Sequence, residues 1–370
     1  MHIENLSLLN FKNYHDLAIS FSPQINCFVG PNGSGKTNVL DAIHYLCLTK
    51  SALNFTDSQL ILHKENYFII NGKVNVKGET SKVASSFQSG KKTFKYNQHT
   101  YERLSEHIGK MPLVIISPND NEIVHEGSEI RRRFFDNILC QYDEEYLHYC
   151  IFYSKFMKNR NALLKQFSER RFIDYDLLEP FDTELLRLNK LIYDKRKEMI
   201  KEFKPIFDFS YLTISDDAEN IELIYKSPVE DPEFKANYRK ALEKDIFLQR
   251  TTLGAHKDDY EFIINGQPLK KFGSQGQQKT YIIALKLGMF KLLEKKKRMR
   301  PLLLLDDIFD RLDPVRVQRL INMLARGHAG QVFITDTDAE RTIGLFKHLK
   351  QDIRFFEVKN ARVKELETTK

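Results

Sequence analysis

The sequence predicts an α/β fold in which a core of buried strands and helices carries an antiparallel β part near its N-terminal end and a helical arm inserted in mid-chain. Three observations predict it. Short apolar runs at 25–29, 113–116 and 302–305 are typical of buried strands in a parallel sheet. A glycine-rich loop links the first run to a pattern of helical spacing. The segment 136–204 contains no glycine and is rich in Lys, Glu, Leu, Phe and Tyr.

Length and composition indicate a globular protein. The chain has 370 residues, which corresponds to roughly two domains or to one domain with a large insertion. A hydrophobic share of 42% can build a sizeable core. No apolar run approaches the roughly 20 residues of a membrane helix, and the start of the chain lacks the layout of a signal peptide. We therefore expect a cytoplasmic protein with no membrane partner.

The charge balance and the cysteines narrow the classes of partner. The formal net charge of +7 is compatible with nucleic acid as a partner. No two cysteines form a C-x-x-C pair, so we expect reduced thiols and neither a disulfide nor a zinc site. The cysteines are Cys27, Cys47, Cys140 and Cys150.

Residues 1–21 are expected to form a β-hairpin, because apolar and polar residues alternate on both sides of a polar turn. The turn contains Lys12 and Asn13, which are candidate contacts for a ligand held by the following glycine-rich loop. On spacing alone, the same residues also describe an ordinary hairpin tip.

The glycine-rich loop fits the phosphate-binding pattern G-x-x-x-x-G-K-[ST]. Its glycines let successive N–H groups turn toward a phosphate, and the helix that follows directs its positive end at the same anion. Lys36 is expected to reach the β- and γ-phosphates of ATP, and the Thr37 hydroxyl to ligate Mg²⁺. The alternative is a chance glycine-rich turn. The expected ATP-binding residues of the loop are Gly30, Pro31, Asn32, Gly33, Ser34, Gly35, Lys36 and Thr37.

Between this loop and the arm, the sequence favours further strands. Residues 66–76 and 92–101 are expected to form antiparallel strands, and Asn71-Gly72 is a hairpin-turn signal. A turn is expected at 117–120. Three consecutive arginines at 131–133 form either a solvated helix face or a contact for a phosphate, a DNA backbone or a partner.

The glycine-free segment predicts a short antiparallel helical arm. Its apolar residues recur at helical spacing as a partial heptad that Lys195 interrupts, and the length excludes a long coiled coil. Strands are expected at 211–214 and 221–225, followed by a helical pattern over 233–250. The apolar positions of the partial heptad are Leu185, Leu188, Ile192, Met199 and Phe203.

A second informative stretch covers residues 251–283. Residues 260–264 are expected to form a strand, and Asn265-Gly266 a turn. Residues 273–279 then open a helix whose start offers backbone donors and a helix dipole to a phosphate. By itself this signal is weak. The phosphate-facing candidates are Ser274, Gln275, Gly276 and Gln277.

A third stretch ends the buried strand 302–305 with two carboxylates. Ligands bind at the C-terminal ends of the strands in such sheets. Asp306 is expected to hold Mg²⁺, directly or through water, as a Walker B acid does. Asp307 is expected to orient or deprotonate the attacking water, which would make it a catalytic residue together with Lys36. The alternative for the acidic pair is a helix N-cap.

Three smaller features complete the C-terminal part. Asp313-Pro314 is expected to start a helix. The buried strand 331–335 ends at Asp336, a candidate switch residue that senses the γ-phosphate. The basic run 295–298 is most simply a solvated loop, with a DNA or partner contact as the alternative.

These motifs resemble the ATP-binding-cassette (ABC) class and, within it, the RecF family. The resemblance covers essentially the whole chain, and Thr37 and Leu302 are separated by 302 − 37 = 265 residues, which is similar to SMC-like heads and argues against a transporter cassette. It implies an α/β fold of ABC type, an SMC-like P-loop ATPase head with an N-terminal antiparallel β subdomain. The helical arm would lie between Walker A and the signature motif. The matching stretches are LLNFKNY, GPNGSGKT, SPND, TLGAHKDDYEFIINGQPLKKFGSQGQQKT, LLLLDDIFDRLD and QVFITD.

The resemblance divides the chain into a head part at 1–130, an arm at 131–250 and a second head part at 251–370. It implies an ATP-dependent DNA clamp in which two subunits sandwich two ATP molecules. Each ATP would lie between the loop of one subunit and the Ser274–Gln277 signature of the other. It further implies slow DNA-stimulated ATP hydrolysis, binding to gapped single-strand/double-strand DNA, and loading of RecA with RecO and RecR. A DNA clamp that holds ATP without useful hydrolysis is the alternative.

The chain departs from the family pattern at three places. Asp310–Asp313 read Asp-Arg-Leu-Asp where Ser-Glu-Leu-Asp is usual. Lys279 stands where arginine is more usual, and the family's proline before the arginine cluster is replaced by the run Gly127-Ser128-Glu129.

Overall fold

The computed structural model describes residues 1–370 except 171, 216–218, 310–313, 326–329 and 368–370. The expected helix start at Asp313 and the departure at 310–313 therefore lie outside the described residues. Contacts divide the chain into two compact units. The head unit is formed by Met1–Asp120, Ser210–Asp216 and Lys279–Lys370, and the arm unit by Asn121–Phe209 and Asp217–Gln278. The three-part division expected from the sequence stays a prediction, and contacts group residues 251–278 with the arm unit.

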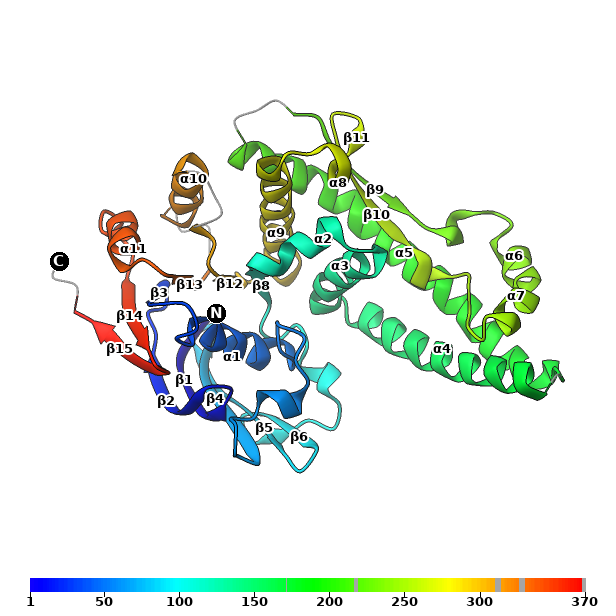
Figure 1. Cartoon of the computed structure of the whole chain (residues 1–370), viewed down its shortest axis with the longest axis horizontal. Helices are drawn as coiled ribbons and strands as arrows, with labels where there is room; N and C mark the ends of the chain where they lie inside the picture. The colour runs from blue at the N-terminus through cyan, green and yellow to red at the C-terminus, as the bar shows by residue number, and fades with distance from the viewer. Residues whose placement is uncertain (171, 216–218, 310–313, 326–329, 368–370) are drawn as a thin grey trace. The chain divides into compact units, whose positions relative to one another are not determined.

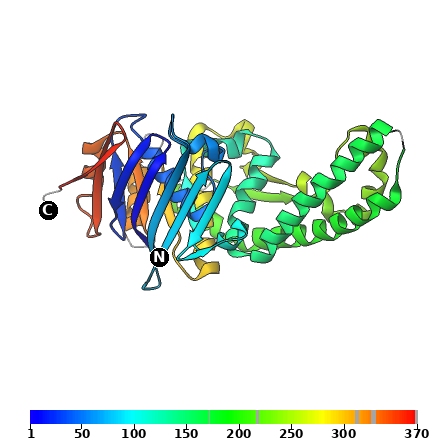
Figure 2. The ribbon, with the colours of Figure 1, turned by 90° about the horizontal axis from the view of Figure 1, so that it is seen from below.

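A six-stranded antiparallel sheet of order β2-β1-β4-β5-β6-β7 forms one layer of the head unit. Figure 2 shows its blue and cyan strands side by side. The expected N-terminal hairpin is confirmed, since β1 pairs antiparallel with β2. The strand bounds are β1 His2–Phe11, β2 Tyr14–Ser20, β4 Tyr67–Val76, β5 Glu79–Gln88, β6 Lys91–Tyr96 and β7 His99–Thr100.

The turn expected at Asn71-Gly72 is wrong. β4 runs through both residues and pairs with β5 along its whole length, and the chain turns instead at Lys77 and Gly78, whose φ angles are 54° and 90°. Gly72 serves close packing, because a Cβ at this position would lie 2.7 Å from Leu46 Cδ1. A glycine where a helix approaches a strand closely has the same sequence signal as a turn glycine.

The second sheet of the head unit has the order β15-β14-β3-β13-β12-β8. β14, β3, β13, β12 and β8 pair in parallel, and β15 adds antiparallel to β14. The parallel register brings the C-terminal ends of β3, β13 and β12 to one edge of the sheet. The strand bounds are β3 Ile25–Val29, β8 Leu113–Ile116, β12 Leu302–Leu305, β13 Val332–Asp336, β14 Ile353–Lys359 and β15 Arg362–Leu366.

Four longer helices lie wholly or mainly in the head unit with this sheet and are labelled in Figure 1. They are α1 Lys36–Leu48, α9 Gln275–Lys297, α10 Pro314–Ala325 and α11 Ala339–Phe346. α1 leads directly out of the glycine-rich loop, as expected. The basic residues Lys295–Lys297 form the last turn of α9, so the loop expected there is wrong. Cations in a last helical turn interact favourably with the negative end of the helix dipole.

In the arm unit, Figures 1 and 2 show α4 and α5 lying side by side, which confirms the expected helical arm. The apolar positions of the partial heptad in α5 are all buried. A three-stranded sheet of order β11-β10-β9 belongs to the same unit. The bounds are α2 Glu122–His125, α3 Ser128–Tyr142, α4 Glu144–Arg170, α5 Tyr175–Ile214, β9 Ile221–Lys226, α6 Phe234–Lys240, α7 Leu242–Phe247, β10 Asp259–Ile264, β11 Gln267–Pro268 and α8 Leu269–Phe272.

The strand expected at 211–214 is wrong, because these residues are the last turn of α5. Pro205 lies inside this helix and does not end it. Tyr211 is fully buried, and its ring centroid lies 6.2 Å from that of Tyr281 in α9. Side-chain packing against α9 thus keeps a β-prone sequence helical.

The apolar core of the head unit lies between α1 and the strands around it and includes Phe11, Phe28, Leu46 and Phe333. Within the described part of the chain, no helix combines the length and the apolar composition needed to cross a membrane.

Candidate functional site

The glycine-rich loop joins the C-terminal end of β3 to α1. Gly30 has φ +154°, and a Cβ at this position would collide with the Val358 carbonyl oxygen. Gly35 has φ +117°, and a Cβ there would lie 2.6 Å from Tyr14 Oη and 2.8 Å from Asn13 Nδ2. Both positions therefore require glycine for space as well as for backbone angle. Neighbouring groups pack closely against the loop at both glycines. A glycine-rich turn arising by chance would not require such close packing.

The N-terminal hairpin tip braces this loop. Tyr14 Oη donates to the Gly35 carbonyl oxygen at 3.0 Å, and Asn13 Nδ2 lies 3.4 Å from the Ser34 carbonyl oxygen. Asn38 Nδ2 in α1 donates to Asn13 Oδ1 at 2.7 Å. Asn13 thus lies beside the loop, as its assignment to the site requires. Sequence reasoning missed Tyr14 and Asn38; the position of Tyr14 next to the hairpin turn was the available signal.

Lys12 lies in the same hairpin tip but points into a buried ion pair. Its Nζ atom is 2.6 Å from Asp41 Oδ2, and both side chains are less than one-tenth exposed. The Asp41 carboxylate also accepts from Ser51 Oγ at 2.8 Å and from the Ala52 amide at 2.6 Å. This contact orders the segment after α1. A direct nucleotide contact by Lys12 stays a prediction.

Lys36 and Thr37 open α1 at the mouth of the loop. Lys36 Nζ donates to the carbonyl oxygens of Gly30 and Pro31 at 2.6 and 2.9 Å. An anionic phosphate oxygen is a stronger acceptor for an ammonium group than a neutral carbonyl. The ammonium therefore lies within the loop, where a phosphate would be held.

Asp306 follows β12 and lies opposite Thr37. Thr37 Oγ1 donates to Asp306 Oδ1 at 2.9 Å, and Thr335 Oγ1 donates to the same oxygen at 2.7 Å. Asp306 is 6% exposed, and within the described residues it forms no ion pair. A buried carboxylate with only neutral donors is a good ligand for a cation. The donor set of Thr37 and Asp306 thus fits Mg²⁺, with oxygen ligands of the type that Mg²⁺ prefers.

Thr335 is a second site residue that the sequence did not reveal. It is fully buried at the C-terminal end of β13, where its hydroxyl also accepts from the Asp307 amide at 2.9 Å. One hydroxyl thus fixes both acids of the pair. Asp307 itself has φ +49°, in the left-handed region that costs a non-glycine residue energy. Such strain persists only where the surrounding structure holds it, and it is common at functional sites. The catalytic role of Asp307 stays a prediction.

Asp336 ends β13 beside the loop, and its main chain and side chain have different partners. The Gly30 amide donates to the Asp336 carbonyl oxygen at 3.2 Å. The carboxylate accepts from Thr342 Oγ1 at 2.5 Å and from the Thr337 amide at 2.7 Å, and it pairs with Arg341. Sensing of a γ-phosphate by this carboxylate stays a prediction. In the described contacts, Asp336 supports the loop through its main chain.

A pocket of about 140 Å³ lies between the glycine-rich loop and Asp307. It suits the phosphate end of a nucleotide, because a cationic helix start, the Asp307 carboxylate and two threonine hydroxyls line it. The lining residues are Asn32, Gly33, Gly35, Lys36, Thr37, Asn38, Asp307 and Thr335.

The expected signature residues belong to the arm unit, at the start of α9. The Ser274 amide donates to Gln277 Oε1 at 2.7 Å and the Gln277 amide donates to Ser274 Oγ at 3.2 Å, a reciprocal helix cap. Gln277 Nε2 also donates to Glu219 Oε1 at 2.6 Å. Ser274 and Gln275 are exposed, so a partner can approach this helix start.

The arginine cluster lies in α3, and its members differ in environment. Arg131 forms a two-bonded ion pair with Asp259, at 2.7 and 3.0 Å. Arg133 is exposed and pairs with Glu129 one helical turn away, as a solvated face does. Arg132 donates from Nη1 to the Asp258 carbonyl oxygen at 2.6 Å. The sequence could not separate these three roles.

Comparison with known proteins places these features in a family context. A family model described as the RecF/RecN/SMC N-terminal domain matches residues 2–360. The DNA replication and repair protein RecF of Cytophaga hutchinsonii is 43% identical over 365 residues, which cover 99% of this chain and 97% of the relative. The protein of the same name from Flavobacterium johnsoniae is 43% identical over 357 residues, covering 96% of this chain and 99% of the relative.

Solved structures agree in fold. The chain is similar to the recombination mediator protein RecF with ATP in the RecFOR pathway, with a TM-score of 0.89, 29% identity, and coverage of 99% of this chain and 98% of that one. The Smc head domain of Pyrococcus furiosus, bound to the C-terminal domain of ScpA, has a TM-score of 0.57 at 18% identity and covers 99% of this chain and 96% of that one. This second likeness shows the fold alone: an ABC-type, SMC-like ATPase head, as expected.

Proposed function

The chain belongs to the RecF family, and on that premise we propose that it is an ATP-dependent DNA-binding protein of recombinational repair and replication. The observation that carries the proposal is the hydrogen bond that joins the end of the glycine-rich loop to Asp306: Thr37 Oγ1 lies 2.9 Å from Asp306 Oδ1. A relative of 29% identity carries ATP, by its name, over nearly the same length of chain.

The residues of the head unit have distinct roles in this proposal. The loop amides and Lys36 hold the phosphates of ATP, and Thr37 and Asp306 hold Mg²⁺. Bound Mg²⁺ supplies positive charge that offsets the negative charge growing on the phosphates. Asp307 orients the attacking water and accepts its proton, while Thr335 keeps Asp306 and Asp307 in register.

ATP also joins two copies of the chain in this proposal. The proposed contacts are Ser274, Gln275, Gly276 and Gln277, at a helix start of the arm unit where Ser274 and Gln275 are exposed, and such a start binds an anion. The γ-phosphate held by the loop of a second copy is the proposed ligand. Hydrolysis removes that phosphate and releases the dimer, so ATP acts as a timed switch on DNA binding.

The proposed polymer is DNA with single-strand/double-strand gaps, and the proposed partners are RecO and RecR, which help to place RecA. The names of the relatives and the RecFOR pathway of the solved structures support this part. The charge distribution agrees, because the whole positive net charge falls in the head unit while the arm unit is slightly acidic. The cytoplasmic location stays a prediction.

A clamp that holds ATP without useful hydrolysis is the second candidate. Asp307 is one methylene shorter than the glutamate common in faster ABC ATPases, which favours slow turnover. A single-turnover ATPase assay with gapped DNA separates the two candidates, with Asp307→Ala as the control. Phosphate release above the level of this control supports hydrolysis, and release at the same level supports the clamp.

Two variants test the site itself. Lys36→Ala should abolish both ATP binding and ATP-dependent dimers, measured by nucleotide fluorescence and light scattering. Ser274→Arg should leave ATP binding of each monomer intact and still block dimers. Dimers of Ser274→Arg with ATP would contradict the shared site, and ATP binding by Lys36→Ala would contradict the loop as the nucleotide site.

A further inference from the structure

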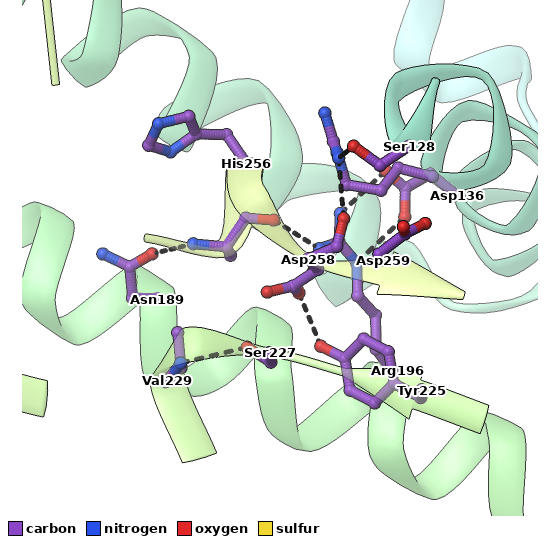
Figure 3. Close-up of polar contacts among 12 residues, drawn as sticks. Ser128, Asp136, Asn189, Arg196, Tyr225, Ser227, Val229, His256, Asp258 and Asp259 are labelled. Carbon is purple, nitrogen blue, oxygen red and sulfur yellow. Dashed lines mark hydrogen bonds and ion pairs between the residues drawn. The ribbon is translucent and has the colours of Figure 1, made fainter. Parts of the chain in front are cut away.

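Most residues of the segment 251–258 in the arm unit form hydrogen bonds with side chains from other parts of that unit. Thr251 accepts from Arg160 Nη1 at 2.8 Å, and the Thr252 amide donates to Asp245 at 2.8 Å. Gly254 has φ +143°, and a Cβ there would lie 2.7 Å from Tyr153 Oη. Figure 3 shows Asp258 of this segment beside Arg196, whereas the ring of His256 points away from it. We call this segment the clamped loop.

Arg196 of α5 is the centre of these contacts. Its Nη1 donates to the Ala255 carbonyl oxygen at 2.8 Å and to Asp258 Oδ2 at 2.5 Å, and its Nη2 donates to Asp136 Oδ2 at 2.9 Å (Figure 3). The Ala255 amide donates to Asn189 Oδ1 at 2.6 Å, and Tyr225 Oη donates to Asp258 Oδ2 at 2.5 Å. Burial alone would lower the pKa of Arg196, but Asp136 and the other anionic neighbours raise it well above its usual value.

Carboxylates of the network face inward and bind buried groups. Asp258 is fully buried and pairs with Arg196, and Asp245 pairs with Arg160, which is itself fully buried. A buried ion network is weak evidence for added stability, because desolvation costs about as much as the ion pairs return. Its clearest effect here is to fix the position of the clamped loop.

Two cations of this region, Lys257 and Arg132, form no ion pair with the described residues. Lys257 is the exposed residue of the clamped loop. Arg132 binds the Asp258 carbonyl oxygen and Ser128 Oγ, both through Nη1, so its other nitrogens make no hydrogen bond to described residues. Burial and then the charge of Arg196 lower the pKa of Arg132. Burial, with Lys257 and Arg132 among the further causes, lowers the pKa of His256 to about 4.

We propose that Lys257 and Arg132 form a preorganised anion site that takes a phosphate of the DNA backbone. Arg132 binds the main-chain carbonyl of the residue that follows Lys257, and after burial the charges of Lys257 and Arg132 both contribute to the lowered pKa of His256, so both cations lie close to His256. Hydrogen bonds hold the Arg132 guanidinium and the backbone beside Lys257 in one geometry, so less entropy is lost on binding a phosphate there than on a mobile segment. A contact with a backbone phosphate does not depend on the base sequence of the DNA. It would add one phosphate contact to those made by other cations of the protein. This inference rests on the proposed DNA binding.

The test compares Lys257→Gln with wild type for binding of a gapped DNA duplex in the presence of a slowly hydrolysed ATP analogue, over a series of salt concentrations. Lys240→Gln is the matched control, since Lys240 is exposed on α6 of the same unit outside the clamped loop. We expect Lys257→Gln to weaken binding several-fold and to lower the slope of log K against log salt by about 0.9. Lys257→Arg should retain both values, and Lys240→Gln should match wild type.

ATP binding, dimerisation and melting temperature of Lys257→Gln should equal those of wild type, because the side chain is exposed and forms no ion pair with the described residues. An affinity and salt slope of Lys257→Gln equal to wild type would overturn the site while leaving DNA binding intact. Equal losses in Lys240→Gln would overturn it in favour of diffuse charge. A wild-type chain that binds no DNA would overturn the proposed function together with this site.

Discussion

Two buried aspartates, one in each unit, have opposite environments. Asp306 of the head unit receives the neutral hydroxyls of Thr37 and Thr335. Asp258 of the arm unit is paired with the buried guanidinium of Arg196. A carboxylate whose charge is already balanced within the fold serves structure, while one with neutral donors retains the capacity to bind a cation. The charge of Asp258 is therefore used within the fold, whereas the charge of Asp306 is available to a bound cation.

The largest effect should follow from Arg196→Met, which keeps the volume and removes the charge. Asp258, which is fully buried, and Asp136, which is partly buried, would then lack their cation, and the free energy of unfolding should fall by about 3–5 kcal/mol. Urea unfolding followed by circular dichroism measures it. The milder Asp136→Asn removes one partner only and serves if Arg196→Met fails to fold. A loss below about 1 kcal/mol in both variants would show that the arm network is as dispensable as a surface pair.

A change of pH should act on the same network through His256. Burial lowers its folded pKa to about 4, below the value of about 6.5 in an unfolded chain. Between pH 6.5 and pH 4 the unfolded chain binds a proton at His256 and the folded chain does not. The contribution of His256 to the free energy of unfolding is therefore fully present above about pH 6.5 and decreases as the pH falls toward 4. The contribution is about 3 kcal/mol at most, from 1.36 kcal/mol per pKa unit.

His44 and His107 in the head unit have folded pKa values lowered to about 4 by the same cause. His256→Gln should therefore make the pH dependence of unfolding shallower without abolishing it. Denaturant midpoints of both proteins, measured between pH 4 and 7, test this expectation. A midpoint that changes with pH in His256→Gln as strongly as in wild type would contradict a buried, neutral His256.

The smallest stability effect should come from Asp306→Asn. Removal of a buried charge that has no ionic partner among the described residues should leave the free energy of unfolding within about 1 kcal/mol of wild type. The dependence of ATP turnover on Mg²⁺ concentration should shift strongly, because one proposed ligand loses its charge. Thermal melting and a Mg²⁺ titration give the two values. A loss of stability as large as that of Arg196→Met would erase the distinction between the two aspartates.

Local sequence patterns predicted the loop, the helix after it and the acid-ended strand, because neighbouring residues alone determine them. Patterns could not predict contacts that depend on distant pairing. Thr335 reaches Asp306 through the parallel pairing of β12 with β13, across 29 residues of sequence. Arg196 reaches Asp136 and Asp258 across 60 and 62 residues. No spacing rule connects such positions, so the sequence alone reveals neither the Thr335 hydroxyl beside the acidic pair nor the network around Arg196.

The same reasoning explains the errors. Gly72 has the sequence signal of a turn but serves the close approach of Leu46, and residues 211–214 have the signal of a strand but pack as helix beside Tyr281. The ion pair of Lys12 with Asp41 likewise depends on the folded position of α1, while a nucleotide contact by Lys12 stays a prediction. Tertiary packing decided the first two cases against a local preference.

The central claim, that ATP is shared between the loop of one copy and the signature of another, is tested most directly by mixing two variants. Lys36→Ala and Ser274→Arg should each remain monomeric with ATP. An equal mixture can form a heterodimer with one intact composite site, in which the loop of the Ser274→Arg chain faces the signature of the Lys36→Ala chain. Mass photometry with a slowly hydrolysed ATP analogue should therefore detect dimers in the mixture and none in either variant alone. A mixture that stays monomeric while wild type dimerises, or dimers of Ser274→Arg alone, would contradict the shared site.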